Sequence, residues 1–187
     1  MELIGFLGHQ GVGKNYLAET ILPKILNKKN TVILAMADHF KVDSICKYNL
    51  EYDKVFGEKD YYTRKKLQEI GTEEGRCKYG EDIWVNILAT WIKTLNKRGT
   101  ERFIITDLRF QNEVDWCKSM GGTVIKINAP NRYMKRVENE SMKNNSNKES
   151  IINHPSESGI DKISNYDYIV DNDYNSNIET QLINIFK

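Results

Sequence analysis

The feature of the sequence that most constrains the fold is a glycine-rich segment directly after a short apolar run. The run, residues 2–7, has the composition of a strand, and residues 8–15 read GHQGVGKN. In this pattern, GxxxxGK, glycines let successive backbone N–H groups face phosphate oxygens, and Lys14 adds a positive charge. A helix is expected from Asn15 onward, with its positive end toward the same phosphates. A plain glycine-rich turn needs neither flanking element, so the segment predicts a phosphate-binding loop.

The residue after the loop lysine departs from the usual pattern. Ser or Thr is usual there, with a hydroxyl that binds magnesium, and this chain has Asn15. An amide oxygen can bind magnesium directly or through water, so ATP with Mg²⁺ remains the expected ligand. The residues expected to contact the nucleotide are Gly8, Gln10, Gly11, Val12, Gly13, Lys14, Asn15 and Tyr16.

The composition is that of an ordinary globular protein. The chain has 187 residues, 40% of them hydrophobic and 28% charged, which predicts a single domain over residues 1–187. A formal net charge of +1 gives no broad basic field, so we expect a small anionic ligand and no nucleic-acid partner.

The cysteines and the hydropathy of the sequence indicate the cellular compartment of the protein. Cys46, Cys77 and Cys117 are odd in number, widely spaced and without a CxxC pair, which is typical of a reducing compartment. No apolar stretch is long enough to suggest a membrane segment, and no basic leader precedes the first strand. We therefore expect no membrane partner and a cytoplasmic location.

Strand and helix patterns alternate along the chain. Continuous apolar runs predict strands over 2–7, 31–36, 102–106, 123–127 and 166–170. Helical spacing predicts helices over 16–26, 61–77, 82–95, 112–119 and a terminal segment near 178–186. The apolar face of the helix over 82–95 comprises Trp84, Val85, Leu88, Trp91, Ile92 and Leu95. This alternation predicts an α/β fold around a parallel sheet.

Residues 130–155 differ in composition from the rest of the chain. Asn, Lys, Ser and Glu prevail there, although residues 132–142 keep a helical pattern. We predict a mobile polar lid. Arg132 and Arg136 lie one helical turn apart, so both could reach a transferring phosphoryl group. The alternative is two exposed basic residues.

A carboxylate that could hold magnesium follows the apolar strand FIIT. This residue is Asp107, and such a carboxylate beside the loop suits a phosphate-loop enzyme. Asp38 ends another predicted strand and is the alternative. Asp107 is favoured because Arg109, two residues on, would present a guanidinium to a phosphate nearby. A helix cap is the structural interpretation of the same aspartate.

Four polar side chains recur at every fourth position of the helix predicted over 61–77. They are Arg64, Gln68, Thr72 and Arg76. Gly71 and Gly75 leave room beside them, and each glycine inside a helix costs about 1 kcal/mol relative to alanine. A helix face that is merely solvated rarely contains two such destabilising glycines, so we expect the stripe to face a substrate.

The motifs, taken in order, resemble the deoxynucleoside monophosphate kinases of large bacteriophages and other large DNA viruses. An Asn or Asp after the loop lysine is similar to that family's habit, and also to that of animal-type phosphomevalonate kinases. The resemblance spans most of the chain. Its segments are GHQGVGKN at 8–15, RKKLQ at 64–68, GT at 71–72, Arg76, Gly80, IWV at 83–85, ITDLRFQNE at 105–113 and HPSE at 154–157.

The resemblance implies a three-layer α/β/α P-loop NTPase fold with a five-stranded parallel sheet, a substrate-binding helical region near 40–98 and a lid near 130–155. It implies ATP-dependent conversion of dNMPs to dNDPs for DNA synthesis, and a possible homodimer. Implied substrate contacts are Asp38, Lys41, Arg64, Gln68, Thr72, Arg76, Trp84, Arg109 and Glu157, with the arginines on the phosphate and Trp84 near the base or sugar. Asn172 would lie against the ATP base. The implied catalytic residues are Lys14, Asp107, Arg109, Arg132 and Arg136, and the implied metal contacts are Asn15 and Asp107.

Two other functions fit parts of the pattern. A monophosphate acceptor is already an oxyanion and needs no strong base. Another small-molecule kinase, of the phosphomevalonate or dephospho-coenzyme A type, could use Asp38 as the base for a hydroxyl acceptor. A slow nucleotide-hydrolysing switch is the second alternative. The Asn-Lys-x-Asp sequence that reads guanine in GTPases is not present, which argues against a GTP-dependent switch.

Overall fold

The structure is a computed structural model that describes residues 1–144 and 147–187. It divides into two compact units, which we describe separately. The core unit comprises residues 1–34 and 96–187, and the helical unit comprises residues 35–95. The helical unit covers most of the region near 40–98 that the resemblance assigns to substrate. That assignment and the single kinase domain stay predictions.

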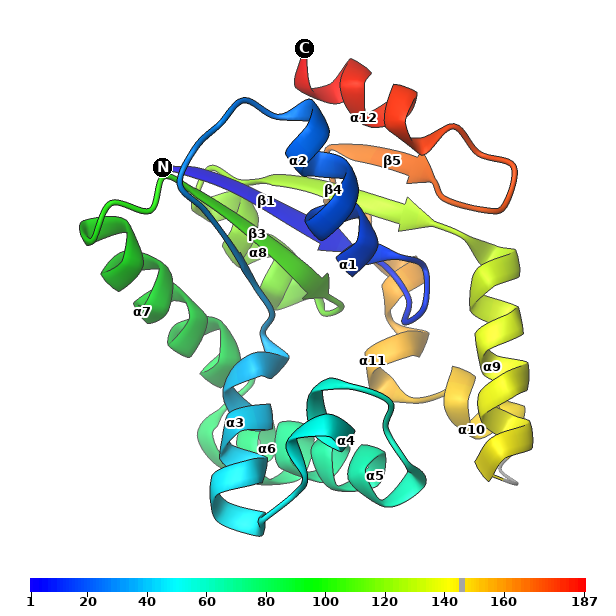
Figure 1. The fold of residues 1–187 in the computed structure, drawn as a ribbon. Helices are drawn as coiled ribbons and strands as arrows, with labels where there is room; N and C mark the ends of the chain where they lie inside the picture. The colour runs from blue at the N-terminus through cyan, green and yellow to red at the C-terminus, as the bar shows by residue number, and fades with distance from the viewer. Residues whose placement is uncertain (145–146) are drawn as a thin grey trace. The chain divides into compact units, whose positions relative to one another are not determined.

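The core unit is built on a five-stranded parallel sheet (Figure 1). The strand order is β2-β3-β1-β4-β5, and every neighbouring pair is parallel. The strands are β1 (Glu2–Leu7), β2 (Thr31–Leu34), β3 (Arg102–Leu108), β4 (Thr123–Asn128) and β5 (Tyr168–Asp171). All five predicted strands are present, and the predicted parallel α/β fold is confirmed.

Helices cover both faces of this sheet. On one face, α1 (Lys14–Tyr16), the π-helical turn η1 (Leu17–Ile21) and α2 (Leu22–Ile25) form one run, and α2 packs with α12 (Ile178–Phe186). On the other face, α8 (Gln111–Ser119) packs on β1 and β4 (Figure 1). The main hydrophobic cluster includes Phe6, Leu17, Leu22, Ile104, Ile125 and Leu182. The core unit therefore has the predicted three layers.

Strand β3 continues past its predicted end at Thr106. Gly5 of β1 pairs with Ile105, but the next registered pair joins Leu7 to Leu108, so the pairing shifts between them. Such a bulge inserts an extra residue in one strand and changes the direction of nearby side chains. The bulge lies where β3 carries Asp107, at the carboxyl end of the sheet.

Gly5 allows α8 to approach the centre of the sheet. A β-carbon there would lie 2.5 Å from Cδ1 of Leu108 and 3.0 Å from Sγ of Cys117. Cys117 is buried in α8, and burial raises the pKa of its thiol to about 12. This cysteine therefore acts as a small apolar packing group rather than as a reactive thiolate.

The segment predicted to be a lid begins with a long helix, α9 (Pro130–Asn144). Tyr133 and Val137 belong to the main hydrophobic cluster, so one face of α9 packs into the core unit. The helices α10 (Lys148–Ile152) and α11 (Pro155–Ser158) and the 3₁₀ turn η3 (Ile160–Lys162) follow. Residues 145–146 lie outside the described residues. The helix predicted over 132–142 is confirmed, and the lid role stays a prediction.

The helical unit consists of short helices around a small core. Leu50, Val55 and Leu67 form its hydrophobic cluster, with Phe40 and Ile45 packed against them. The elements are α3 (Ala37–Tyr48), α4 (Tyr52–Phe56), α5 (Tyr61–Glu69), the π-helical η2 (Ile70–Arg76), α6 (Cys77–Tyr79) and α7 (Ile83–Lys97), whose last two residues belong to the core unit. The helices predicted over 61–77 and 82–95 are present.

The prediction that Asp38 ends a strand is wrong. Strand β2 ends at Leu34, and Asp38 lies in the first turn of α3. Its Oδ2 accepts a hydrogen bond from the N–H of Ala35 at 2.8 Å. The carboxylate therefore stabilises the turn that begins α3, as acidic residues commonly do at helix N-termini.

The apolar face predicted for α7 is wrong at Trp91, which is 47% exposed. The buried residues of the helix are Trp84, Val85, Leu88 and Ile92. At 100° per residue, Trp91 lies about 70° from the centre of the arc that these residues span. It therefore stands at the margin of the buried face.

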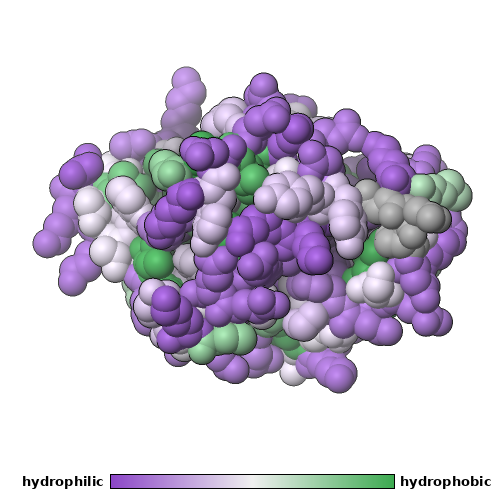
Figure 2. Space-filling view, turned by 90° about the horizontal axis from the view of Figure 1, so that it is seen from below, coloured by the Kyte–Doolittle hydropathy of each residue, from purple (hydrophilic) through white to green (hydrophobic). Residues whose placement is uncertain are grey.

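The surface shown in Figure 2 is largely hydrophilic, and its hydrophobic residues form small separate patches. Within the described residues, no helix combines the length and the apolar character needed to cross a membrane.

Candidate active site

The glycine-rich loop joins β1 to α1 at the carboxyl end of the central strand (Figure 1). Gly11 and Gly13 have φ angles of 87° and 93°, which residues with a β-carbon rarely adopt. A β-carbon on Gly13 would lie 2.4 Å from Nδ2 of Asn172, and one on Gly11 would lie 3.1 Å from Cγ of Arg136. The loop leads into a helix that begins at Lys14. This is the arrangement in which backbone N–H groups and a helix N-terminus bind phosphate.

Lys14 is buried beside the loop. Its Nζ donates hydrogen bonds to the carbonyl oxygens of Gly8 and His9, at 2.5 and 2.6 Å. Burial, followed by the positive charge of Arg109, lowers the pKa of Lys14 to about 7, and Arg136 acts in the same direction. Three cationic side chains therefore gather at the loop, an environment that favours a bound anion.

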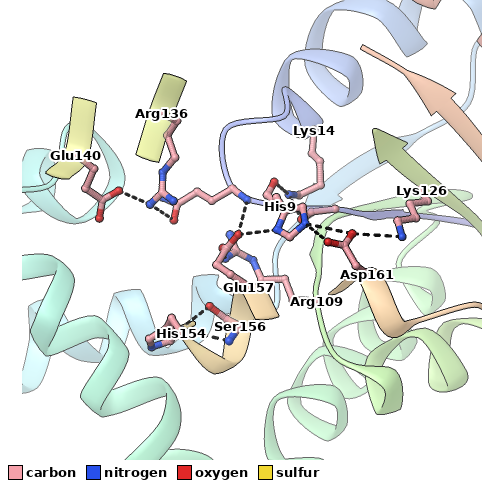
Figure 3. A network of polar contacts seen from close by, with 12 residues as sticks. His9, Lys14, Arg109, Lys126, Arg136, Glu140, His154, Ser156, Glu157 and Asp161 are labelled. Carbon is pink, nitrogen blue, oxygen red and sulfur yellow. Dashed lines mark hydrogen bonds and ion pairs between the residues drawn. The ribbon is translucent and has the colours of Figure 1, made fainter. Parts of the chain in front are cut away.

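A buried carboxylate links Arg109 to the loop (Figure 3). Arg109 Nη1 donates to Glu157 Oε1 at 2.6 Å. Glu157 Oε2 accepts from the N–H of Gln10 at 3.2 Å and lies 3.0 Å from His9 Nδ1. Burial alone would raise the pKa of Glu157, but the hydrogen bonds from His9 and Gln10 and the charge of Arg109 lower it. Both oxygens thus have protein partners, and the substrate contact of Glu157 stays a prediction.

Two aromatic residues that the sequence did not single out complete this network. The ring of His9 stacks on Tyr133 of α9, with ring centroids 4.3 Å apart and planes at 25°. His9 Nε2 lies 3.3 Å from both carboxylate oxygens of Asp161. The carboxylates of Glu157 and Asp161 are 148 and 152 residues from His9 in the chain. No local pattern could have revealed these contacts.

The two arginines of α9 have different partners. Arg136 Nη2 donates to Gln10 Oε1 of the loop at 2.8 Å and also pairs with Glu140 (Figure 3). The guanidinium of Arg132 instead lies 4.8 Å from the ring centroid of Tyr174. Arg136 is therefore at the loop and Arg132 is at the segment after β5, so a shared role over one phosphoryl group stays a prediction.

The segment after β5 also contacts the loop. Asn172 is buried, and its Nδ2 donates to the carbonyl oxygen of Val12 at 2.8 Å. The carboxylate of Asp173 accepts hydrogen bonds from the N–H groups of Asn131 and Arg132, at 3.3 and 3.2 Å, at the start of α9. The loop, β5 and α9 are thus joined at one place. The predicted contact of Asn172 with the ATP base stays a prediction.

The predicted metal residues lie at the same edge of the core unit. Asp107 is half-buried in the β3 bulge and raises the pKa of Lys14, against the effect of burial, while Asn15 is exposed in α1. Over residues 1–144 and 147–187, no group of three or more His, Cys, Asp or Glu could hold a metal ion. Magnesium in nucleotide sites needs only one or two protein oxygens besides phosphates and water. A carboxylate and an amide therefore suit a nucleotide-bound magnesium.

Three cations gather within the helical unit. Lys41 Nζ lies 3.1 Å from Asp38 Oδ1 and 5.1 Å from the ring centroid of Phe56. Lys59, which the sequence did not single out, has a pKa lowered to about 8 by burial and by the charges of Lys41 and Arg64. Mutually repelling cations of this kind are stabilised by an anion.

Trp84 is buried within the helical unit and packed against two glycines. Its Nε1 donates to the carbonyl oxygen of Gly71 at 2.8 Å. A β-carbon on Gly75 would lie 2.3 Å from Cζ2 of Trp84, and one on Gly71 would lie 3.3 Å from Cζ of Phe40. The room that the two glycines leave is thus filled by Trp84 and Phe40, and the substrate-facing role of the polar stripe stays a prediction.

The four residues of the predicted polar stripe do not all lie on one regular α-helix. The α-helical spacing that relates its members ends at Glu69, where α5 passes into the wider π-helical η2. Arg76 Nη1 donates to the carbonyl oxygen of Glu81 at 2.9 Å. The other members, Arg64, Gln68 and Thr72, are half-buried, exposed and half-buried respectively. Their contacts with a substrate stay predictions.

A family model described as deoxynucleotide monophosphate kinase matches residues 13–181. The chain belongs to the deoxynucleotide monophosphate kinase family. A protein of Acanthamoeba polyphaga mimivirus named "Putative deoxynucleotide monophosphate kinase" is 26% identical over 193 residues, which cover 92% of this chain and 89% of that protein. A solved structure from the PezAT toxin-antitoxin system of Streptococcus pneumoniae is similar over 91% of this chain and 68% of that chain, with 17% identity and a TM-score of 0.41.

Membership of the deoxynucleotide monophosphate kinase family makes this chain a kinase, a transferase of nucleotide metabolism that acts on a small-molecule nucleotide. The glycine loop and the parallel sheet place it in the P-loop NTPase fold. The matched region begins at Gly13 and includes Lys14, Arg109, Glu157 and Asn172. The residues that surround the loop thus come from the part of the chain that the family model matches.

Proposed function

We propose that the chain transfers the γ-phosphoryl group of ATP to the 5′-phosphate of a deoxynucleoside monophosphate, giving dNDP and ADP for DNA synthesis. The observation that carries the proposal is the gathering of Lys14, Arg109 and Arg136 at a glycine loop that leads into a helix. Phosphoryl transfer needs alignment of donor and acceptor and neutralisation of charge on the transferring group. The three cations at the loop are suited to that neutralisation, and the loop is suited to holding the donor.

The loop would hold the phosphates of ATP. Backbone N–H groups around Gly11 and Gly13 would bind phosphate oxygens, with Lys14 as the mobile charge and Arg136 above the loop at Gln10. Asn15 and Asp107 would hold magnesium, which when bound neutralises charge on the phosphate oxygens.

The acceptor phosphate would be bound by arginines. Arg109 in the core unit is the one that we assign to this phosphate, and the roles of Arg64 and Arg76 stay predictions from the family resemblance. Trp84 would lie near the base or sugar. A phosphate acceptor needs no general base, and Asp38, the base for a hydroxyl acceptor, already accepts hydrogen bonds from Ala35 and Lys41. This favours a phosphate acceptor.

The test is an acceptor panel. Release of ADP from magnesium-ATP is measured with the purified chain and with dNMPs, NMPs, phosphomevalonate or dephospho-coenzyme A. Fast turnover with one or more dNMPs is expected. Turnover with another acceptor alone would reassign the substrate, and slow ADP release that no acceptor stimulates would support a nucleotide-dependent switch instead.

A pair of lysine variants controls this experiment. Lys14→Ala should lower turnover by about 10² to 10³-fold, because it removes a charge that acts on the transferring group. Lys24→Ala, at an exposed lysine that lies 3.6 Å from Glu179 in α12, should leave turnover unchanged.

The cytoplasmic location and the homodimer stay predictions. Sedimentation of the purified chain would test the homodimer.

A further inference from the structure

One buried carboxylate holds two parts of the site at once. The side chain of Glu157 is 4% exposed, and its two oxygens bind different elements. Oε1 accepts from Arg109 Nη1 at 2.6 Å, whereas Oε2 accepts from the N–H of Gln10 at 3.2 Å and lies 3.0 Å from His9 Nδ1. An ionised carboxylate only accepts hydrogen bonds, so Nδ1 carries the hydrogen in the contact with Oε2.

His9 is held on several sides. Its ring stacks on Tyr133 of α9 at 4.3 Å, and Nε2 lies 3.3 Å from the carboxylate of Asp161, which lies 3.6 Å from Lys126 Nζ (Figure 3). The carbonyl oxygen of His9 also accepts a hydrogen bond from Lys14 at 2.6 Å. A displacement of His9 therefore moves an anchor of the loop lysine.

We propose that His9 and Glu157 are positioning residues that fix the phosphate loop and the Arg109 guanidinium in one arrangement. The proposal rests on the proposed phosphoryl transfer, in which the loop holds the donor and Arg109 holds the acceptor. Neither residue need touch a substrate. Their effect is to set the position of the phosphate loop relative to Arg109, and these two groups contact the substrates.

The expected signature is a loss of kcat with little change in KM. A displacement of about 1 Å between reacting groups can cost 10²-fold in rate, while each substrate still binds through its other contacts. A contact that served only to bind a substrate would instead raise the KM for that substrate.

Two variants of His9 test which ring nitrogen matters. His9→Asn places an amide N–H near the position of Nδ1 and can keep the bond to Glu157, whereas His9→Gln places it near Nε2 and can keep only the contact with Asp161. We expect His9→Asn to keep kcat within about threefold of the original chain, and His9→Gln to lose about 10 to 100-fold. Equal losses in the two variants would overturn the proposal.

Glu157→Gln tests the carboxylate, with Glu149→Gln as its matched control. Glu149 is an exposed residue of α10 in the same part of the chain. Glu157→Gln should lose about 10 to 100-fold in kcat, with each KM within about threefold, and Glu149→Gln should equal the original chain. The double variant His9→Gln/Glu157→Gln should lose little more than either single variant, because both break one network. Full activity of Glu157→Gln would overturn the proposal.

Folding and function are separated by two further measurements. Thermal unfolding by circular dichroism gives the folded fraction, and a loss of kcat that only follows the folded fraction would overturn the positioning role. Hydrolysis of ATP by water needs no acceptor, so it still applies if no dNMP is turned over and the proposed function fails. In that case a hydrolysis rate that is about 10-fold lower for His9→Gln than for His9→Asn, at equal calorimetric affinity for ATP, supports the positioning role of His9, and equal rates overturn it.

Discussion

Gly13 and Asn172 are so close that a β-carbon on the glycine would lie 2.4 Å from Nδ2 of the asparagine. Asn172 Nδ2 in turn donates to the carbonyl oxygen of Val12 at 2.8 Å. The backbone of the phosphate loop therefore depends on a side chain from the last strand region, 160 residues away along the chain. A β-carbon at position 13 would therefore require the Asn172 side chain to shift.

Replacing Gly13 by alanine should be more harmful than an equal change at Gly99. Both have similar positive φ angles, 93° and 98°, but nothing lies within 4 Å of a β-carbon on Gly99. Gly99→Ala should thus lower the free energy of unfolding by backbone strain alone, about 1 kcal/mol, and Gly13→Ala by roughly 1–3 kcal/mol more because of crowding. Urea unfolding measures both. Adding Asn172→Ala should recover part of the Gly13→Ala loss, and a purely additive result would contradict the crowding argument.

Lys14 should make the stability of the chain depend on pH above neutrality. Its pKa is about 7 in the folded chain and 10.5 as the ordinary value, so between these the unfolded chain binds more protons. The contribution of Lys14 to the free energy of unfolding should therefore increase as pH rises from 7 to 10.5. It should decrease again as pH falls to 7. The measurement is urea unfolding from pH 7 to 10 for the original chain and for Lys14→Met. A difference between the two that does not change with pH would refute this.

Lys59 should react with pyridoxal 5′-phosphate, an aldehyde that carries a phosphate. Its pKa of about 8 leaves much of the amine neutral and nucleophilic at pH 8. Borohydride trapping and peptide mass spectrometry should show faster labelling of Lys59 than of the exposed Lys65. A dNMP should protect Lys59, whereas ATP should protect Lys14. Protection of Lys59 by ATP and not by dNMP would place it on the donor side.

Gly75→Ala should weaken the helical unit more than Gly71→Ala. Alanine is favoured over glycine in helices by about 1 kcal/mol, which works in favour of both variants. The β-carbon at 75 would lie 2.3 Å from Trp84, whereas the one at 71 would lie 3.3 Å from Phe40. We expect Gly71→Ala to be nearly neutral and Gly75→Ala to cost roughly 1–3 kcal/mol, measured by urea unfolding followed by tryptophan fluorescence. Equal stabilities would show that Trp84 can shift without cost.

The sequence predicts the parts of the fold that local patterns encode. The apolar runs of β1 and β3 and the glycine loop were sufficient to place the sheet and the phosphate loop, because both depend on neighbouring residues. The predicted end of β3 is two residues too early, because the end of this strand is set by a bulge against β1. The sequence misplaces Asp38 because this residue lies in the first turn of α3, a helix with a weak apolar pattern, where its carboxylate accepts a hydrogen bond from the N–H of Ala35.

The contacts that organise the site were beyond local pattern. His9 occupies a variable position of the loop motif, and its partners Glu157 and Asp161 come from an HPSE segment and a short turn about 150 residues later. The lowered pKa of Lys59 likewise arises from tertiary neighbours. Gly75 is costly in a helix, and helical spacing does not reveal that the space beside it is occupied by Trp84.

The bond between Asn172 and the loop has a consequence for synthesis of the protein. The phosphate loop, residues 8–15, is translated well before its partner Asn172, which follows Val12 by 160 residues. While those residues are being translated, the nascent chain carries the nucleotide-binding motif without the side chain that supports it. Competence to bind a nucleotide should appear abruptly, when the final strand and the asparagine after it have left the exit tunnel.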